Sequence, residues 1–237
     1  MVSGQTPTAA AGRDPFLSLK SGGTEVYLIR HGDALPDADE VVTDGSYNSQ
    51  ALSDLGRRQA EALAERMRGL DVAAIYASPI PRAYQTAEPS ARALGLDVVV
   101  EDGLREIELG DVGPALPDNA TAEDHARRLR ERLHEIASIA MTSGKWASIP
   151  GSESAADLRA RATETVERLA LAHPGARIAL FSHGGTINAY IAEMLGVERD
   201  YFFPCANTSI SVVRLRGDRR LLLGLNDVGH LQQAGLI

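Results

Sequence analysis

The stretch Val26-Tyr27-Leu28-Ile29-Arg30-His31-Gly32-Asp33 decides the fold and locates the chemistry. Its first four residues are apolar, and a short apolar run that stops at a glycine is typical of a buried strand. Arg30 and His31 stand where that strand must end, and Gly32 lets the backbone turn without a bulky side chain in the way. Because open α/β sheets bind ligands beyond the carboxyl ends of their strands, we expect Arg30 and His31 to face a ligand.

Strand-like and helical patterns alternate along the rest of the chain. The helix starting at residue 55 has Ser53 as its N-cap, and Pro89 is expected to kink or shorten the next helix. The expected strands are residues 25–29, 72–77, 98–101, 177–181, 209–215 and 220–225, and the expected helices are residues 55–68, 82–94, 122–141, 154–171 and 186–195. This order predicts an α/β fold, a three-layer sandwich whose mostly parallel mixed sheet has helices on both faces. The turn dipeptide Gly217-Asp218 predicts a closing antiparallel hairpin.

The length of 237 residues suits one well-buried domain rather than two. We expect residues 1–23, rich in small and polar side chains, to form a disordered leader, and residues 24–237 to form the domain. Insertions are expected near residues 35–50 and 110–149, on the ligand side of the sheet. The helix over residues 122–141 carries many charges, and we expect it to be solvated, including its histidines His125 and His134.

Composition excludes several kinds of partner. The formal net charge of −8 argues against nucleic acid or an anionic membrane. No apolar run approaches the ~20 residues that a membrane-spanning helix needs. The single cysteine, Cys205, allows no intramolecular disulfide and is expected to be a buried structural residue. We therefore expect a cytoplasmic protein, and a homodimer through a sheet edge is compatible with the predicted fold. No histidine pair has a carboxylate at metal-binding spacing, so we expect neither a metal nor a cofactor.

Three further motifs follow the strand end in order along the chain. They are Ser78-Pro79-Ile80-Pro81-Arg82-Ala83-Tyr84-Gln85-Thr86-Ala87, then Leu104-Arg105-Glu106-Ile107, then Phe181-Ser182-His183-Gly184-Gly185-Thr186. Together the four motifs resemble the histidine phosphatase superfamily, which includes the cofactor-dependent phosphoglycerate mutases. The resemblance covers the chain from about Thr24 to about Leu231.

This resemblance implies a set of roles. His31 would be the nucleophile that becomes a phosphohistidine, and Glu106 would donate a proton to the leaving group. The phosphate would be bound by four residues besides the nucleophile: Arg30, Arg82, His183 and Gly184. Elementary chemistry agrees with these roles. Arginine forks suit bidentate contacts with phosphate oxygens, and a neutral imidazole with an ordinary pKa of ~6.5 is nucleophilic at cellular pH.

The acceptor of the phosphoryl group separates the alternatives. Mutases of the superfamily typically show Asn-Glu-Arg-His-Tyr-Gly around the acid, whereas this chain has Arg105-Glu106-Ile107-Glu108-Leu109-Gly110, which favours a phosphatase. Protein phosphohistidine phosphatases share the Arg-His-Gly-Asp-Ala opening, but they are usually shorter and lack an equivalent of Glu106. A catalytically retired protein that binds phosphorylated metabolites would usually lose the nucleophile or the acid. We therefore expect a metal-independent phosphomonoesterase that acts on a small phosphorylated substrate.

Overall fold

One mixed sheet of six strands organises the molecule. The computed structural model describes residues 23–35, 47–110 and 120–237. The strands are β1 (Thr24–Arg30), β2 (Ala74–Ala77), β3 (Val98–Val100), β4 (Arg177–Ser182), β5 (Ile210–Arg216) and β6 (Arg219–Asp227). They lie in the order β3-β2-β4-β1-β5-β6. The four strands from β3 to β1 are parallel, and β5 and β6 add an antiparallel hairpin.

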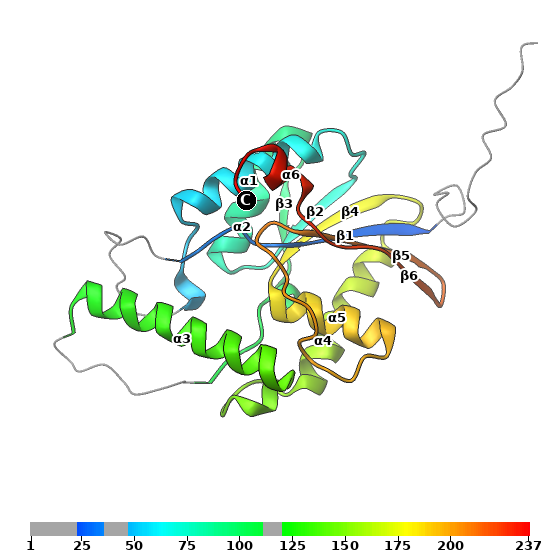
Figure 1. Cartoon of the computed structure of the whole chain (residues 1–237). Helices are drawn as coiled ribbons and strands as arrows, with labels where there is room; N and C mark the ends of the chain where they lie inside the picture. The colour runs from blue at the N-terminus through cyan, green and yellow to red at the C-terminus, as the bar shows by residue number, and fades with distance from the viewer. Residues whose placement is uncertain (1–22, 36–46, 111–119) are drawn as a thin grey trace, which may run out of the picture.

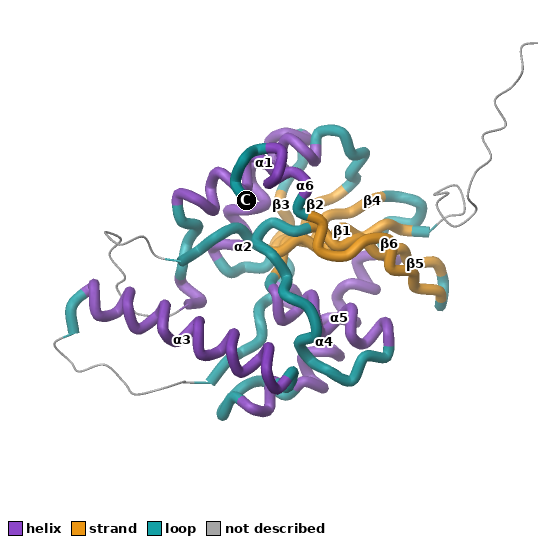
Figure 2. The backbone as a smooth tube through the Cα atoms, in the orientation of Figure 1, coloured by secondary structure: helices purple, strands orange, loops and turns teal. Residues whose placement is uncertain are grey.

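Helices cover both faces of this sheet, as the sequence predicts. The helices are α1 (Asp54–Met67), α2 (Pro81–Leu94), α3 (Ala122–Ser143), α4 (Ala155–Leu171), α5 (Gly184–Leu195) and α6 (Gly229–Gln233). Figure 1 shows α1, α2 and α6 on one side of the sheet and α4 and α5 on the other, with α3 extending beyond them. The tube in Figure 2 shows the same three layers, with the orange strands between two purple layers. The predicted three-layer α/β fold is confirmed.

The central strand β1 contributes side chains to both cores. Tyr27 and Ile29 belong to the apolar cluster under α1 and α2, whereas Val26 and Leu28 belong to the cluster under α4 and α5. Successive side chains of a strand point to opposite faces, so a strand buried on both sides must be apolar at every position. This is the physical reason that the continuous run before Arg30 predicts a central strand.

Two helices test the start and stop signals that the sequence predicts. The Ser53 hydroxyl accepts a hydrogen bond from the Gly56 N–H at 3.0 Å, which confirms the expected N-cap of α1. The expected shortening at Pro89 is wrong, because α2 continues through it to Leu94. Pro89 is buried and α2 packs along α1, so tertiary packing offsets the one hydrogen bond that the proline removes.

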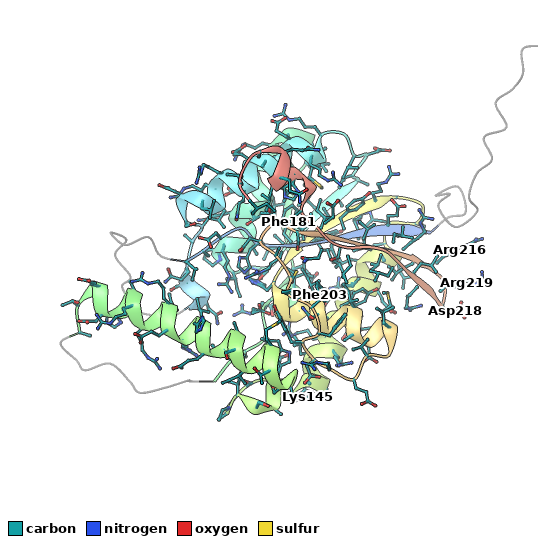
Figure 3. All side chains as sticks on the ribbon, viewed as in Figure 1. Lys145, Phe181, Phe203, Arg216, Asp218 and Arg219 are labelled. Atoms are coloured by element: carbon teal, nitrogen blue, oxygen red, sulfur yellow. The ribbon has the colours of Figure 1, made fainter. Side chains whose placement is uncertain are left out.

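The predictions for the remaining segments are confirmed only in part. The predicted hairpin is confirmed, and Figure 3 labels Arg216, Asp218 and Arg219 at its tip. Residues 1–22 of the expected leader, and residues 36–46 and 111–119 of the expected insertions, lie outside the described residues. The homodimer through a sheet edge, which here means β3 or β6, stays a prediction. Within the described part of the chain, no helix has the length and apolar character that crossing a membrane requires.

Candidate active site

The register of the sheet brings three strand ends to one point. Arg30 of β1 pairs with Ser182 of β4, so His31 and His183 follow side by side. Their imidazole centroids lie 5.1 Å apart, with 56° between the ring planes. On the other side of β4, Ala77 pairs with Phe181, which brings Ser78 beside the same edge. Parallel strands thus gather residues that are more than a hundred positions apart in the sequence.

The hydrogen bonds of His31 assign its tautomer. Nδ1 lies 2.7 Å from the carbonyl oxygen of Gly32, which can only accept, so Nδ1 carries the proton. Nε2 lies 3.1 Å from Nε of Arg82, which can only donate, so Nε2 keeps its lone pair. The ring is only 1% exposed. His31 therefore presents an unprotonated Nε2, the atom that a nucleophilic imidazole needs, next to a guanidinium.

Arg82 reaches this point from the first turn of α2 and is fully buried. Thr86, one turn later, ties this helix to the end of β1. Its hydroxyl donates to the Arg82 carbonyl oxygen at 2.6 Å and accepts the Gly32 N–H at 2.9 Å. The helix that carries the arginine and the loop that carries the histidine are thereby held in one arrangement.

The electrostatic environment keeps both histidines neutral. The pKa of His31 is lowered well below 6.5, first by burial and then by the positive charges of Arg82 and Arg30. The pKa of His183 is also lowered well below 6.5, first by burial and then by Arg82, with smaller contributions from His31 and Arg30. Burial disfavours the charged form of a base, and neighbouring cations act in the same direction. The same positive field favours a bound anion.

Glu106 lies at the start of α5 rather than in open solvent. Its Oε1 accepts the N–H groups of Ile107 at 3.0 Å and Thr186 at 3.2 Å, while Oε2 accepts the Gly185 N–H at 3.4 Å. The positive end of a helix suits a carboxylate. Gly185 must be a glycine for this contact, because a Cβ there would lie 2.5 Å from Oε1 of Glu106. The start of α5 thus fixes the carboxyl group of Glu106 through backbone N–H groups.

A cavity of about 410 Å³ opens beside these residues. Arg30, Glu106 and Gly184 line it, whereas His31, Arg82 and His183 lie deeper and are at most 1% exposed. Arg30 also donates to the carbonyl oxygen of Cys205 at 2.6 Å. The structure therefore brings all six predicted site residues to one place: a buried trio and three residues at the cavity wall.

The helix α3 corrects one expectation from the sequence. The charge pattern predicts a solvated helix, and His134 is exposed as expected, but one face of α3 also lines the cavity, through Arg130, Leu133, His134 and Ala137. The expectation holds for Arg127, which is exposed and pairs with Asp124 at 2.5 Å. Apolar residues of the inward face, such as Leu133 and Ile136, stand among charged residues, and the charged residues dominate the pattern in the sequence.

The comparisons with known proteins agree with this geometry. Residues 26–228 match the histidine phosphatase superfamily (branch 1). The chain belongs to this family. The resemblance that the four motifs indicate is therefore confirmed. Membership in the histidine phosphatase superfamily supports a phosphatase or another phosphoryl-transfer enzyme.

Relatives within the superfamily bear different names at the same similarity. Phosphoglycerate mutase-like protein 4 of Arabidopsis thaliana is 30% identical over 217 residues, covering 90% of this chain and 89% of that protein. Phosphoserine phosphatase 1 of Hydrogenobacter thermophilus is 30% identical over 214 residues, covering 87% and 94%. The structure of a mycobacterial glucosyl-3-phosphoglycerate phosphatase matches with a TM-score of 0.65 and 25% identity, covering 86% and 99%. Identity alone does not separate mutase from phosphatase.

Three further contacts at this histidine phosphatase site were not predicted from the sequence. The Ser78 hydroxyl lies 2.9 Å from Nε2 of His183. The carbonyl oxygen of His31 accepts from Nδ2 of Asn207 at 3.1 Å and from the Thr208 N–H at 3.2 Å. Thr208 has a φ of 52°, which is rare for a β-branched residue. Ser78 could have been found, because it directly follows the strand β2, whereas Asn207 and Thr208 had no signal in the sequence.

Two further expectations concern the chemistry of the site. Cys205 is buried, and burial raises the pKa of its thiol, which agrees with the predicted structural role. Among the residues that the structure describes, no group of three or more His, Cys, Asp or Glu side chains is arranged to hold a metal ion.

Proposed function

We propose that this chain is a metal-independent phosphomonoesterase that acts through a phosphohistidine at His31 on a small phosphorylated metabolite. The observation that carries the proposal is the tautomer of His31, whose unprotonated Nε2 lies 3.1 Å from Nε of the buried Arg82 and accepts its hydrogen bond. A nucleophile ready at neutral pH and a cation for the phosphate oxygens are the two things that this chemistry needs first.

The first step transfers the phosphoryl group to the protein. Nε2 of His31 attacks phosphorus while the bond from phosphorus to the ester oxygen breaks. The leaving alkoxide takes a proton from the carboxyl group of Glu106, and the two arginines neutralise the charge on the equatorial oxygens. A positioned acid contributes about 10²–10⁴-fold to such a step.

The second step returns the histidine to its starting state. Water attacks the phosphohistidine and gives its proton to Glu106, so inorganic phosphate leaves and the acid is restored. The sequence around Glu106 favours water over a second substrate hydroxyl as acceptor, because it lacks the residues typical of mutases. The phosphatase names of two relatives support the same choice.

Trapping the phosphoenzyme tests the nucleophile. The wild-type protein, mixed with a ³²P-labelled phosphomonoester and quenched, should carry an acid-labile and base-stable label. His31→Ala should lose the label together with turnover. His125→Ala, a change to a histidine of α3 that lies outside the cavity wall, should keep both. A label that persists in His31→Ala would refute the phosphohistidine at this position.

A substrate panel tests the acceptor and the metal. We expect phosphate release from several phosphomonoesters, among them phosphoserine, with the same rate in the presence of EDTA and without a bisphosphate activator. Interconversion of 2- and 3-phosphoglycerate with little phosphate release would make the chain a mutase. Binding of these compounds without turnover would indicate a retired enzyme.

A further inference from the structure

We propose that the cavity beside Glu106 selects phosphomonoesters with an apolar leaving group, either aryl or branched or extended alkyl, over those with a compact charged one. This inference rests on the proposed phosphatase function and names the substrate class of the same site. The cavity opens from the catalytic residues themselves, because Arg30, Glu106 and Gly184 form part of its wall. Whatever is bonded to the phosphate must therefore occupy it.

The wall next to the proton donor is aromatic. Trp146 and Tyr201 both line the cavity, and their rings meet edge to face with centroids 5.6 Å apart. A Cβ built on Gly185 would lie 3.3 Å from the indole carbon Cζ2 of Trp146 and 2.5 Å from the carboxylate of Glu106. The indole and the carboxylate thus flank the same glycine. The atoms just beyond the scissile oxygen would meet an aromatic surface.

A second part of the wall is aliphatic and comes from the helix α3. Leu133, Ile136, Ala137 and Ala140 recur at helical spacing along the face that lines the cavity. Ile107, directly after the proton donor, adds another apolar side chain. A carboxylate or ammonium group placed against these side chains would gain no polar partner from them.

The aromatic wall is held firmly in place. The backbone N–H of Trp146 donates to Oδ2 of Asp200 at 3.2 Å, and Oδ1 of the same carboxylate accepts from Arg159 at 3.2 Å. Figure 3 labels Lys145, the residue just before Trp146, at the end of α3. Trp146 is only 4% exposed. A preformed apolar surface of this kind binds an apolar group without first having to be ordered.

Polar side chains also line the cavity: Asp33 and Asn207 besides Arg30 and Glu106, and Arg130 and His134 on α3. Arg130 and His134 lie nearer the start of α3, whereas Ala137 and Ala140 follow later in the helix, toward Trp146. A substrate with an acidic group far from its phosphate could reach Arg130 past the apolar walls. If such substrates were preferred, the polar region around Arg130, and not the apolar walls, would determine the specificity.

A homologous series measures the preference directly. Ethyl, butyl and hexyl phosphate have nearly the same leaving-group chemistry, so differences in kcat/KM report binding of the chain. We expect kcat/KM to rise about fourfold for each added methylene, the usual effect of burying one such group. Phosphoserine should be a poorer substrate than butyl phosphate. A flat or falling series, or a preference for phosphoserine that Arg130→Gln removes, would overturn the proposal while leaving the phosphatase function intact.

A matched pair of variants locates the effect on the cavity. Ala137 and its neighbour Ser138 are both exposed on α3, but only Ala137 lines the cavity. Ala137→Asn should reduce kcat/KM for hexyl phosphate about tenfold and leave the value for ethyl phosphate within twofold. Ser138→Asn introduces the same side chain one position further along α3 and should change neither value. Asparagine is a weaker helix former than alanine or serine, so urea denaturation of both variants should accompany the kinetics. Equal effects of the two variants on kcat/KM would refute the assignment to the cavity.

A binding measurement separates this inference from the proposed reaction. The chain has a single tryptophan, Trp146, so its intrinsic fluorescence reports on the aromatic wall. Hexylphosphonate has no ester bond and does not turn over. We expect it to shift the tryptophan emission with an affinity at least tenfold higher than that of ethylphosphonate, and inorganic phosphate should leave the emission unchanged. If the emission shifts while no phosphomonoester is hydrolysed, the reaction fails and the cavity assignment stands. No shift at saturation would refute the cavity assignment.

Discussion

The two ends of the strand β1 bury charges in opposite ways. At the amino end, Glu25 is 6% exposed and lies between two arginines. Its Oε2 accepts from Nε of Arg177 at 2.8 Å, and its Oε1 accepts from Arg214. A carboxylate here stands between the guanidinium groups, and such a pair is costly to break.

At the carboxyl end, two arginine contacts have neutral acceptors. Arg82 donates to an imidazole nitrogen and Arg30 donates to a backbone carbonyl. The positive field remains strong enough to lower the pKa values of both histidines. This difference in charge compensation shows how one strand can stabilise the fold at one end and form a binding site at the other. Charge compensated by a buried carboxylate stabilises the fold, whereas charge that still acts on the neighbouring imidazoles can attract an anion.

Removing the guanidinium at the carboxyl end should have the largest effect. Arg82→Met should lower kcat/KM for a phosphomonoester about 10³-fold, or ~4 kcal/mol, because a buried donor to the transferring phosphoryl group is lost. Urea denaturation should show that the free energy of unfolding does not fall. A loss of stability with little loss of activity would mean that both ends of β1 are structural.

The corresponding change at the amino end should act on stability. Arg214→Met should lower the free energy of unfolding by about 3 kcal/mol, because it breaks a buried ion pair. Steady-state kinetics should show kcat/KM within twofold of the wild type. The double variant Glu25→Gln/Arg214→Met should recover part of the stability, since it removes the buried carboxylate charge together with one of its two arginine partners. A large fall in kcat/KM would contradict the separation between the two ends.

The proposed acid should respond to the leaving group. Glu106→Gln keeps an oxygen for the N–H groups of α5 but has no proton to donate. We expect kcat/KM for an alkyl phosphate to fall about 10²-fold, and that for p-nitrophenyl phosphate, whose phenolate leaves unaided, to fall less than tenfold. Equal losses on the two substrates would mean that Glu106 positions groups rather than protonating the leaving oxygen.

Two fully buried serines form a smaller test. Ser78 lies 2.9 Å from Nε2 of His183, whereas the Ser90 hydroxyl has no hydrogen-bond partner within the described structure. Ser78→Ala should lower kcat/KM about tenfold, because the imidazole loses the group that orients it. Ser90→Ala removes a hydroxyl of equal burial and should leave kcat/KM unchanged.

The smallest expected effect is the dependence of the free energy of unfolding on pH. The folded-state pKa values of His31 and His183 lie below 6.5, the ordinary value, so the unfolded chain binds more protons as the pH falls through 6.5. Stability should therefore decrease as the pH falls below about 6.5 and be fully present above it. Urea denaturation between pH 8 and pH 5 measures this slope. Sulfate should flatten the slope relative to chloride at equal ionic strength, because an anion beside the arginines favours the protonated imidazoles.

Several elements were readable from local patterns. The run before Arg30 predicts β1, because a strand buried on both faces is apolar throughout. The strand end singled out His31, and the resemblance of the four motifs to the histidine phosphatase superfamily implied Arg82, Glu106 and His183, which the structure brings together with it. At Pro89 the local rule gave the wrong answer, because packing between α1 and α2 outweighs the loss of one hydrogen bond.

The sequence by itself determined which residues carry charge, which segments become strands, and which strand ends carry chemistry, because these properties depend on neighbours along the chain. Only the tertiary structure decided how those ends meet. The contact between Ser78 and His183 spans 105 residues, and that between Asn207 and His31 spans 176. Such contacts follow from sheet register and helix packing. The cavity wall on α3 was decided in the same way, since a face becomes inner or outer only when another element packs opposite it.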